Sequence, residues 1–171
     1  MYQDFDDFSA EITQKLSDEL LLLKEGIIKK FPAIDLSPII DLKDNIYDAY
    51  KEQVKDTTNL KTVFCTNAAY AGIKTPMHKK DNGKLMPALE SRIFYEDIPF
   101  GLLILHNIGE ILGIRTPTMD TCIFWAQDLM KMKYLEKNGK MNQKAIQSTG
   151  CPMKFGISTI EQLVNNSLAW E

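Results

Sequence analysis

An apolar segment near the middle of the chain constrains the fold more than any other feature. It runs from Pro99 to Leu112, carries apolar side chains around most of its circumference, and is followed directly by Gly113. Proline fits the first turn of a helix, and glycine is favoured just past the last turn because it adopts left-handed backbone angles without strain. The segment therefore predicts a central helix that other helices cover. Spanning a bilayer takes about 20 apolar residues; polar side chains interrupt this run, so neither a transmembrane segment nor a membrane partner is expected.

Apolar side chains at helical spacing predict further helices on both sides of this segment. The expected helices cover residues 10–30, 38–56, 59–65, 99–112 and 117–134, with a last one from residue 158 onward. Ser9, Ser37 and Ser158 are the expected N-caps, and Glu161 completes a capping box with Ser158. The sequence shows no alternating strand pattern of useful length. We therefore predict the all-α class and a single domain.

Two features between and within these helices need a separate explanation. Residues 67–89 are irregular, and Asp81-Asn82-Gly83 predicts a tight turn there, in either a long ordered loop or a small hairpin. Gly101 and Gly109 lie inside the central helix, where each costs about 1 kcal/mol relative to alanine. We expect another backbone or a ligand to lie close to them.

Composition excludes several classes of protein. The chain has 171 residues, is 44% hydrophobic, and carries a net charge of −3 without any basic run. Nucleic acid is therefore not an expected partner, because phosphate binding needs clustered lysine and arginine. The three cysteines form no C-x-x-C pair; Cys65 and Cys122 have apolar neighbours and are expected to be buried free thiols in a reducing, cytoplasmic setting. The acidic N-terminal residues do not form a signal peptide.

The candidate chemical group is Arg92 with Glu96 and Asp97, at the mouth of the central helix. If residues 91–96 are helical, Arg92 faces Glu96 at a spacing of four residues, which predicts an ordinary surface ion pair. Asp97 would then simply favour the positive end of the helix. In the alternative interpretation, Arg92 holds a substrate carboxylate through its two-pronged guanidinium, and Asp97 orients a catalytic histidine.

Neither histidine of the chain lies in a recognisable catalytic motif. His78 is in a charged loop and is expected to be solvated, whereas His106 lies within the central helix and is expected to be a satisfied core or groove residue. No cluster of residues has the spacing of metal ligands. The nine glycines never form a Gly-x-Gly pair, so no dinucleotide site of the usual kind is expected.

The segment ESRIFYEDIPFGLLILHNIGEILGIRTPTMD, residues 90–120, resembles the signature of the helical domain of the opine dehydrogenases of the octopine and nopaline type. Shared positions include Ser91, Arg92, Glu96, Asp97 and the Pro99–Leu102 segment. Further along, Gly113, Thr116, Pro117 and Asp120 also match. Upstream, NAAYAGIKTP at residues 67–76 is similar to a second segment of the family, and GISTIEQLV resembles its C-terminal end.

The resemblance implies an all-α fold similar to the C-terminal domain of 6-phosphogluconate dehydrogenase. It also implies an oxidoreductase acting on CH–NH bonds, in which an amino acid and a 2-oxo acid condense and NADH or NADPH reduces the product. In that family a Rossmann domain precedes the helical domain. By position, Asp97 corresponds to the active-site acid that pairs with the catalytic histidine, and Arg92 corresponds to the arginine that lines the substrate site near it.

The sequence departs from the family pattern in three respects. Ile93 replaces a tyrosine, residues 139–156 differ, and the Rossmann domain with its catalytic histidine is absent from the chain. We therefore expect residues 1–171 to be the helical substrate domain of a longer enzyme, without cofactor and without activity when alone. Its expected partners are that Rossmann domain, the two substrates and, in one alternative, a second copy in a homodimer. The competing interpretation is a stand-alone helical binding or interaction module without catalytic function.

Overall fold

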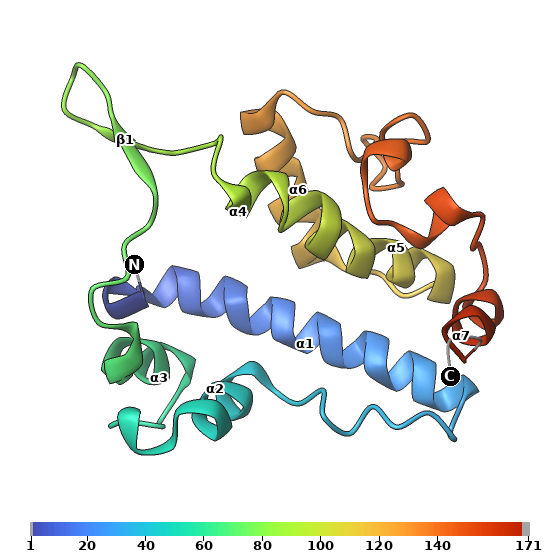
Figure 1. Ribbon diagram of the computed structural model, residues 1–171, viewed down its shortest axis with the longest axis horizontal. Coiled ribbons are helices and arrows are strands. Elements are labelled where there is room, and N and C mark those ends of the chain that lie inside the picture. Colours follow the sequence, from blue (N-terminus) through green and yellow to red (C-terminus); the bar gives the residue numbers. More distant parts are fainter. Residues whose placement is uncertain (1, 169–171) are drawn as a thin grey trace. The chain divides into compact units, whose positions relative to one another are not determined.

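The computed structural model describes residues 2–168 (Figure 1) and divides them into two compact units. Residues up to Leu21 together with Asp35–Ala88 form the first unit, and Leu22–Ile34 together with the chain from Leu89 onward form the second. The long helix α1, Asp7–Lys30, contributes residues to both units. Among the residues described, no helix is both long and apolar enough to cross a membrane.

The first unit contains two further helices and a hairpin. Helix α2 covers Leu42–Tyr50 and helix α3 covers Leu60–Thr66, while strands β1, Met77–Lys79, and β2, Leu85–Pro87, pair antiparallel. The hairpin turn contains Gly83 at a φ of 78°, which confirms the tight turn predicted there and selects the hairpin over the long loop. A small core holds the helices together; its buried members are Ile46, Val54, Leu60, Val63 and Phe64.

Helix α2 begins later than its sequence predicts. Asp41, not Ser37, is the N-cap, and one carboxylate oxygen accepts a hydrogen bond of 2.9 Å from the backbone N–H of Lys43. The other carboxylate oxygen of Asp41 accepts a hydrogen bond of 2.6 Å from the side-chain amide of Gln14 on α1. Asp41 therefore caps one helix and anchors it to another, a role that local sequence preference around Ser37-Pro38 does not reveal.

The second unit is built from α4, Arg92–Tyr95, a wide turn at Ile98–Leu102, α5, Leu103–Leu112, α6, Pro117–Met130, and α7, Ile160–Leu168. Helix α5 packs beside α6 (Figure 1). The fully buried side chains of this unit include Leu103, Met119, Ile123, Leu135, Ile146, Cys151 and Ile160. The central helix predicted from the apolar segment is thus confirmed, with a wide turn in place of its first residues.

The central helical segment carries the predicted proline at its start and the predicted glycine at its end. Pro99 lies in the first turn, and Gly113 ends α5 in the left-handed conformation at a φ of 70°. A Cβ at Gly109 would lie 3.0 Å from the backbone carbonyl oxygen of Ile114, which confirms the expected close approach. Gly101 has no protein atom within 4 Å of a Cβ built there, so a close backbone is wrong at this residue and a close ligand stays a prediction.

Other predicted helix boundaries need correction. Helix α1 begins at Asp7, and Asp6, not Ser9, accepts the capping hydrogen bond, 2.7 Å from the backbone N–H of Ser9. Helix α6 ends at Met130 instead of residue 134, because Lys131 adopts left-handed angles at a φ of 56°. The last helix is capped by Thr159 and Gln162, one residue after the predicted pair.

Candidate functional site

The group singled out from the sequence lies on the short helix α4 and just after it. The guanidinium of Arg92 lies 2.9 Å from the carboxylate of Glu96, and the two side chains are 79% and 55% exposed. The predicted ion pair at four-residue spacing is therefore present. Exposed pairs of this kind stabilise a fold by at most about 1 kcal/mol, so stability alone gives little reason for it.

Asp97 follows this pair at the start of the wide turn and is exposed. Its backbone carbonyl accepts a hydrogen bond of 2.8 Å from the N–H of Leu102, five residues along the chain. Turns of this width are frequent at functional sites because they displace side chains from regular helical positions. Tyr95 and Phe100 are also more than half exposed, so polar and aromatic side chains share this surface.

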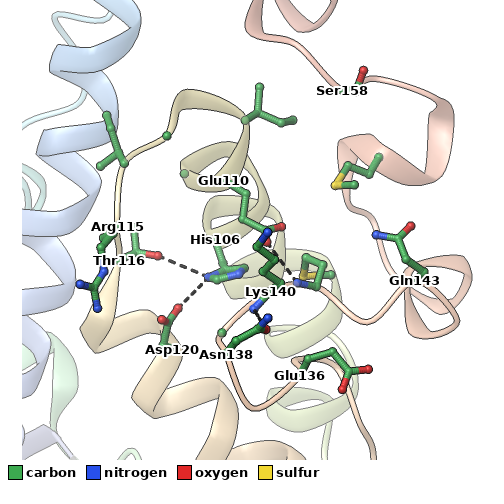
Figure 2. A pocket seen from close by; sticks show the side chains of 17 residues that line it. His106, Glu110, Arg115, Thr116, Asp120, Glu136, Asn138, Lys140, Gln143 and Ser158 are labelled. Carbon is green, nitrogen blue, oxygen red and sulfur yellow. Dashed lines mark hydrogen bonds and ion pairs between the residues drawn. The ribbon is translucent and has the colours of Figure 1, made fainter.

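A second polar site lies further along α5, and the sequence did not predict it. A cavity of about 820 Å³ in the second unit is lined by α5, by the start of α6 and by residues 136–143, with Met153 and Ser158 completing the wall. Figure 2 shows the side chains that line this cavity. Arg92 and Asp97 are not among them, so the two polar sites are separate.

His106 and Thr116 are buried polar residues that line this cavity. The Nδ1 atom of His106 lies 2.9 Å from Oδ1 of Asp120 and 3.4 Å from the hydroxyl of Thr116, and the His106 side chain is 5% exposed. Its Nε2 atom has no hydrogen-bond partner among the described residues. The expectation of a fully satisfied core histidine therefore holds for one ring nitrogen only.

Glu110 is one turn after His106 and holds the opposite wall in place. One carboxylate oxygen accepts a hydrogen bond of 3.1 Å from the backbone N–H of Met141, and the other accepts 3.3 Å from the side-chain amide of Asn107. A tight hairpin at residues 136–140 completes this wall; Gly139 sits in it at a φ of 79°, and a Cβ there would lie 3.1 Å from Oδ2 of Asp120.

The remaining candidate residues have simpler surroundings. His78 lies on strand β1 and is exposed. All three cysteines are free, and the buried Cys151 donates a hydrogen bond to the carbonyl of Leu103 at 3.3 Å, while its burial raises the pKa of the thiol. Among residues 2–168, no group of three acidic, histidine or cysteine side chains is placed to hold a metal ion.

Sequence spacing could not place His106 beside Asp120. The two residues lie on different helices, and the turn after Gly113 sets the distance between them. The local signal was limited to His106 and Glu110, which share one face of α5 because they are four residues apart. That pattern indicates a common face and leaves the partners of that face open.

The helices and the two polar sites define a mainly helical domain of the all-α class. Over residues 1–130 the chain matches the family described as NAD/NADP octopine/nopaline dehydrogenase, alpha-helical domain. It belongs to that family, and the resemblance drawn from residues 67–120 is confirmed.

Individual relatives agree with this assignment. The chain is 36% identical to opine dehydrogenase of Haliotis discus hannai over 164 residues, covering 96% of this chain and 40% of the relative. It is 33% identical to tauropine dehydrogenase of Arabella iricolor over 163 residues, covering 95% of this chain and 41% of the relative. The chain thus spans about two-fifths of the length of the curated relatives it matches.

Solved structures show the same fold. An octopine dehydrogenase with NADH and L-arginine superposes with a TM-score of 0.89 at 28% identity, over 95% of this chain and 40% of that one. An octopine dehydrogenase with NADH and pyruvate gives a TM-score of 0.82 at 26% identity, over 97% and 39% of the two chains. The all-α fold predicted from the sequence is confirmed.

Proposed function

We propose that residues 1–171 form the helical substrate domain of an NAD(P)H-dependent opine dehydrogenase. The observation that carries this proposal is the match to opine and octopine dehydrogenases over nearly the whole chain, at only 40% of their length. The remaining part of such an enzyme would be the Rossmann domain, which makes that domain the principal partner of this chain. A homodimer stays a prediction from the sequence.

The reaction joins the amine of an amino acid to the carbonyl carbon of a 2-oxo acid. Loss of one water gives an imine, and addition of a hydride to the imine carbon and a proton to its nitrogen gives the secondary amine product. The nicotinamide cofactor supplies that hydride. The helical domain would supply groups that bind the substrate and position the proton-transferring residue.

Arg92 is the proposed substrate-binding residue. A guanidinium presents two parallel N–H donors that match the two oxygens of a carboxylate, and both proposed substrates carry one. Because Arg92 is 79% exposed and its pairing with Glu96 is a surface contact, its side chain is free to exchange Glu96 for a substrate carboxylate at small energetic cost.

Asp97 is the proposed catalytic acid of this domain. A carboxylate hydrogen-bonded to one ring nitrogen of a histidine fixes the tautomer and stabilises the protonated ring. Asp97 is exposed at the start of the wide turn, so a histidine from another domain can reach it. The proposed role is therefore to orient a catalytic histidine that this chain does not contain.

The cofactor is assigned to the Rossmann domain. Dinucleotide sites of that fold need glycines in a Gly-x-Gly arrangement so that the backbone approaches the pyrophosphate closely. This chain has nine glycines and no such pair. Its residues do not fit the dinucleotide, so no step of the reaction is assigned to a cofactor site within this chain.

The test is kinetic and uses an enzyme that contains both domains. Oxidation of NADH and of NADPH is followed with pyruvate and a panel of amino acids. We expect Asp97→Asn to lower kcat by about 10²- to 10⁴-fold, because the histidine loses its orienting carboxylate. We expect Arg92→Lys to raise KM for the oxo acid by about tenfold or more with a smaller effect on kcat.

Asp128→Asn is the matched control, because Asp128 is an exposed acid on α6 outside both polar sites. It should leave kcat and KM unchanged. An Asp97→Asn enzyme with full kcat would rule out the catalytic role. A two-domain protein without amino-acid-dependent oxidation of either cofactor would favour the binding-module interpretation instead.

A further inference from the structure

We propose that the cavity around His106 is a binding site for a small molecule that carries a primary ammonium group. Its volume of about 820 Å³ falls within the range of about 300–1,000 Å³ that is usual for small-ligand sites. It is distinct from the proposed catalytic surface, because neither Arg92 nor Asp97 lines it. The proposal does not depend on the dehydrogenase function.

The unpartnered nitrogen of His106 indicates that a ligand belongs in this cavity. The Nε2 atom of His106 is buried and has no hydrogen-bond partner among residues 2–168. Leaving a buried polar atom without a partner costs about 1–3 kcal/mol, and such atoms are rare in folded proteins. A ligand group that bonds to Nε2 would remove this cost.

The orientation of the ring determines what kind of group this must be. Nδ1 of His106 lies 2.9 Å from Oδ1 of Asp120, and an ionised carboxylate only accepts hydrogen bonds, so we assign the proton of the neutral ring to Nδ1. In the neutral ring, Nε2 is then an acceptor. Figure 2 shows Thr116 and Asp120 on one side of the ring, with Glu110 and Lys140 drawn on the other. The ligand must therefore present an N–H or O–H donor.

The fixed charges of the cavity favour a cationic donor. Oδ1 of Asp120 lies 2.9 Å from Nδ1 of His106, and both oxygens of Glu110 accept hydrogen bonds, one from Met141 and one from Asn107. These two carboxylates are therefore pre-positioned. A third lining acid, Glu136, already pairs with Lys133 at 2.8 Å, so it adds less to this field.

The cations of the cavity are of a different kind. Arg115 and Lys140 line it but are exposed at the ends of long, flexible side chains. The immobile charge is thus negative and the mobile charge is positive. An ammonium group supplies three N–H donors on a compact positive centre, which matches the imidazole acceptor together with the two carboxylates. It would displace the Lys140 ammonium from the cavity.

The test uses three small probes of matched chain length, n-butylammonium, 1-butanol and butanoate, with the full 171-residue chain. Binding is followed by NMR through the imidazole resonances of His106 and the amide of Met141. We expect saturable binding of n-butylammonium, at least tenfold weaker binding of 1-butanol, and no saturation by butanoate. Tighter binding of butanoate would mean that Nε2 donates, and would overturn the proposal, as would the absence of n-butylammonium binding.

Two substitutions of exposed lysines make the test independent of folding defects. Lys140→Met removes the competing ammonium and should tighten n-butylammonium binding severalfold. Lys137→Met is the matched control: Lys137 lies in the same hairpin and is exposed but does not line the cavity. Equal binding by the two variants, or weaker binding by Lys140→Met, would overturn the proposal. His106→Phe should abolish saturation if that variant folds.

Discussion

Single residues in this chain carry constraints that composition does not reveal. Gly139 illustrates this, because it combines left-handed backbone angles with a contact to the side chain that holds His106. Tyr70 in the first unit, whose ring contacts those of Tyr2 and Tyr50, is a second case, since a partly buried phenol changes how the fold responds to alkaline pH. Each gives a prediction that concerns one side chain.

Gly139→Ala should destabilise the chain more than Gly156→Ala. Both glycines have similar φ angles, 79° and 76°, so both variants suffer the strain of a left-handed alanine, about 1 kcal/mol. Only at residue 139 would the new Cβ also press on Asp120, at 3.1 Å, whereas residue 156 has nothing within 4 Å. We expect an additional loss of about 1 kcal/mol for Gly139→Ala in urea unfolding. Equal losses would show that the Asp120 contact yields freely.

Tyr70 should make the fold sensitive to high pH. Burial, with a smaller contribution from the neighbouring Tyr50, raises the pKa of Tyr70 from 10.0 to about 12. Because the folded pKa exceeds the unfolded one, this contribution to stability is complete below pH 10 and is lost as pH rises through about 12. Between pH 10 and about pH 12, the urea concentration at the unfolding midpoint should fall less steeply in Tyr70→Phe than in the wild type. Tyr47→Phe, at an exposed tyrosine, is the control and should keep the wild-type slope.

At the scale of elements, the sequence predicts helices better than their ends. The central helix, its glycine end and the tight turn at Gly83 follow from local preferences that the fold leaves unchanged. The start of α2 does not, because Asp41 is selected by a contact with Gln14 from α1. The cavity was missed for the same reason: His106, Asp120 and Met141 meet through tertiary packing that no local spacing encodes.

The cap of α7 provides a direct test at this scale. The hydroxyl of Thr159 accepts a hydrogen bond of 3.2 Å from the backbone N–H of Gln162. In return, the side-chain oxygen of Gln162 accepts a hydrogen bond of 3.2 Å from the backbone N–H of Thr159. Thr159→Ala should therefore lower the free energy of unfolding by about 1 kcal/mol. Glu161→Ala should have little effect, although the sequence alone favours it as the capping residue. A larger loss for Glu161→Ala would reinstate that earlier prediction.

At the scale of the whole molecule, the chain corresponds to about two-fifths of the length of its relatives. It belongs to a dehydrogenase family whose relatives extend over more than twice its length. The fold could be predicted from the sequence because helical periodicity is a local property. Only the family favours the proposed roles of Arg92 and Asp97 over an ordinary surface ion pair, since an exposed ion pair and an exposed acid are common on any protein surface.

The isolated chain should not bind nicotinamide cofactors. Fluorescence titration with NADH and with NADPH, in the presence of an amino acid and pyruvate, should show no saturation and no oxidation. The physical reason is the absence of any Gly-x-Gly segment that could approach a pyrophosphate. A two-domain enzyme is the positive control. Saturable binding to the 171-residue chain would place a cofactor site within it and would require a new role for Asp97.

The wide turn at residues 98–102 also affects how this surface can change during evolution. In this turn a backbone hydrogen bond joins residues five apart, whereas in an α-helix it joins residues four apart. One extra residue rotates the side-chain direction by about 100°, so Asp97 points about 100° away from the position that a continuous extension of α5 would give it. The packing of α5 therefore determines which of its faces is buried, whereas the wide turn determines the direction of the Asp97 side chain. Substitutions that repack the core along residues 103–112 leave the acid where it is. Core residues of α5 can thus be substituted during evolution without moving Asp97, although both belong to one continuous stretch of chain.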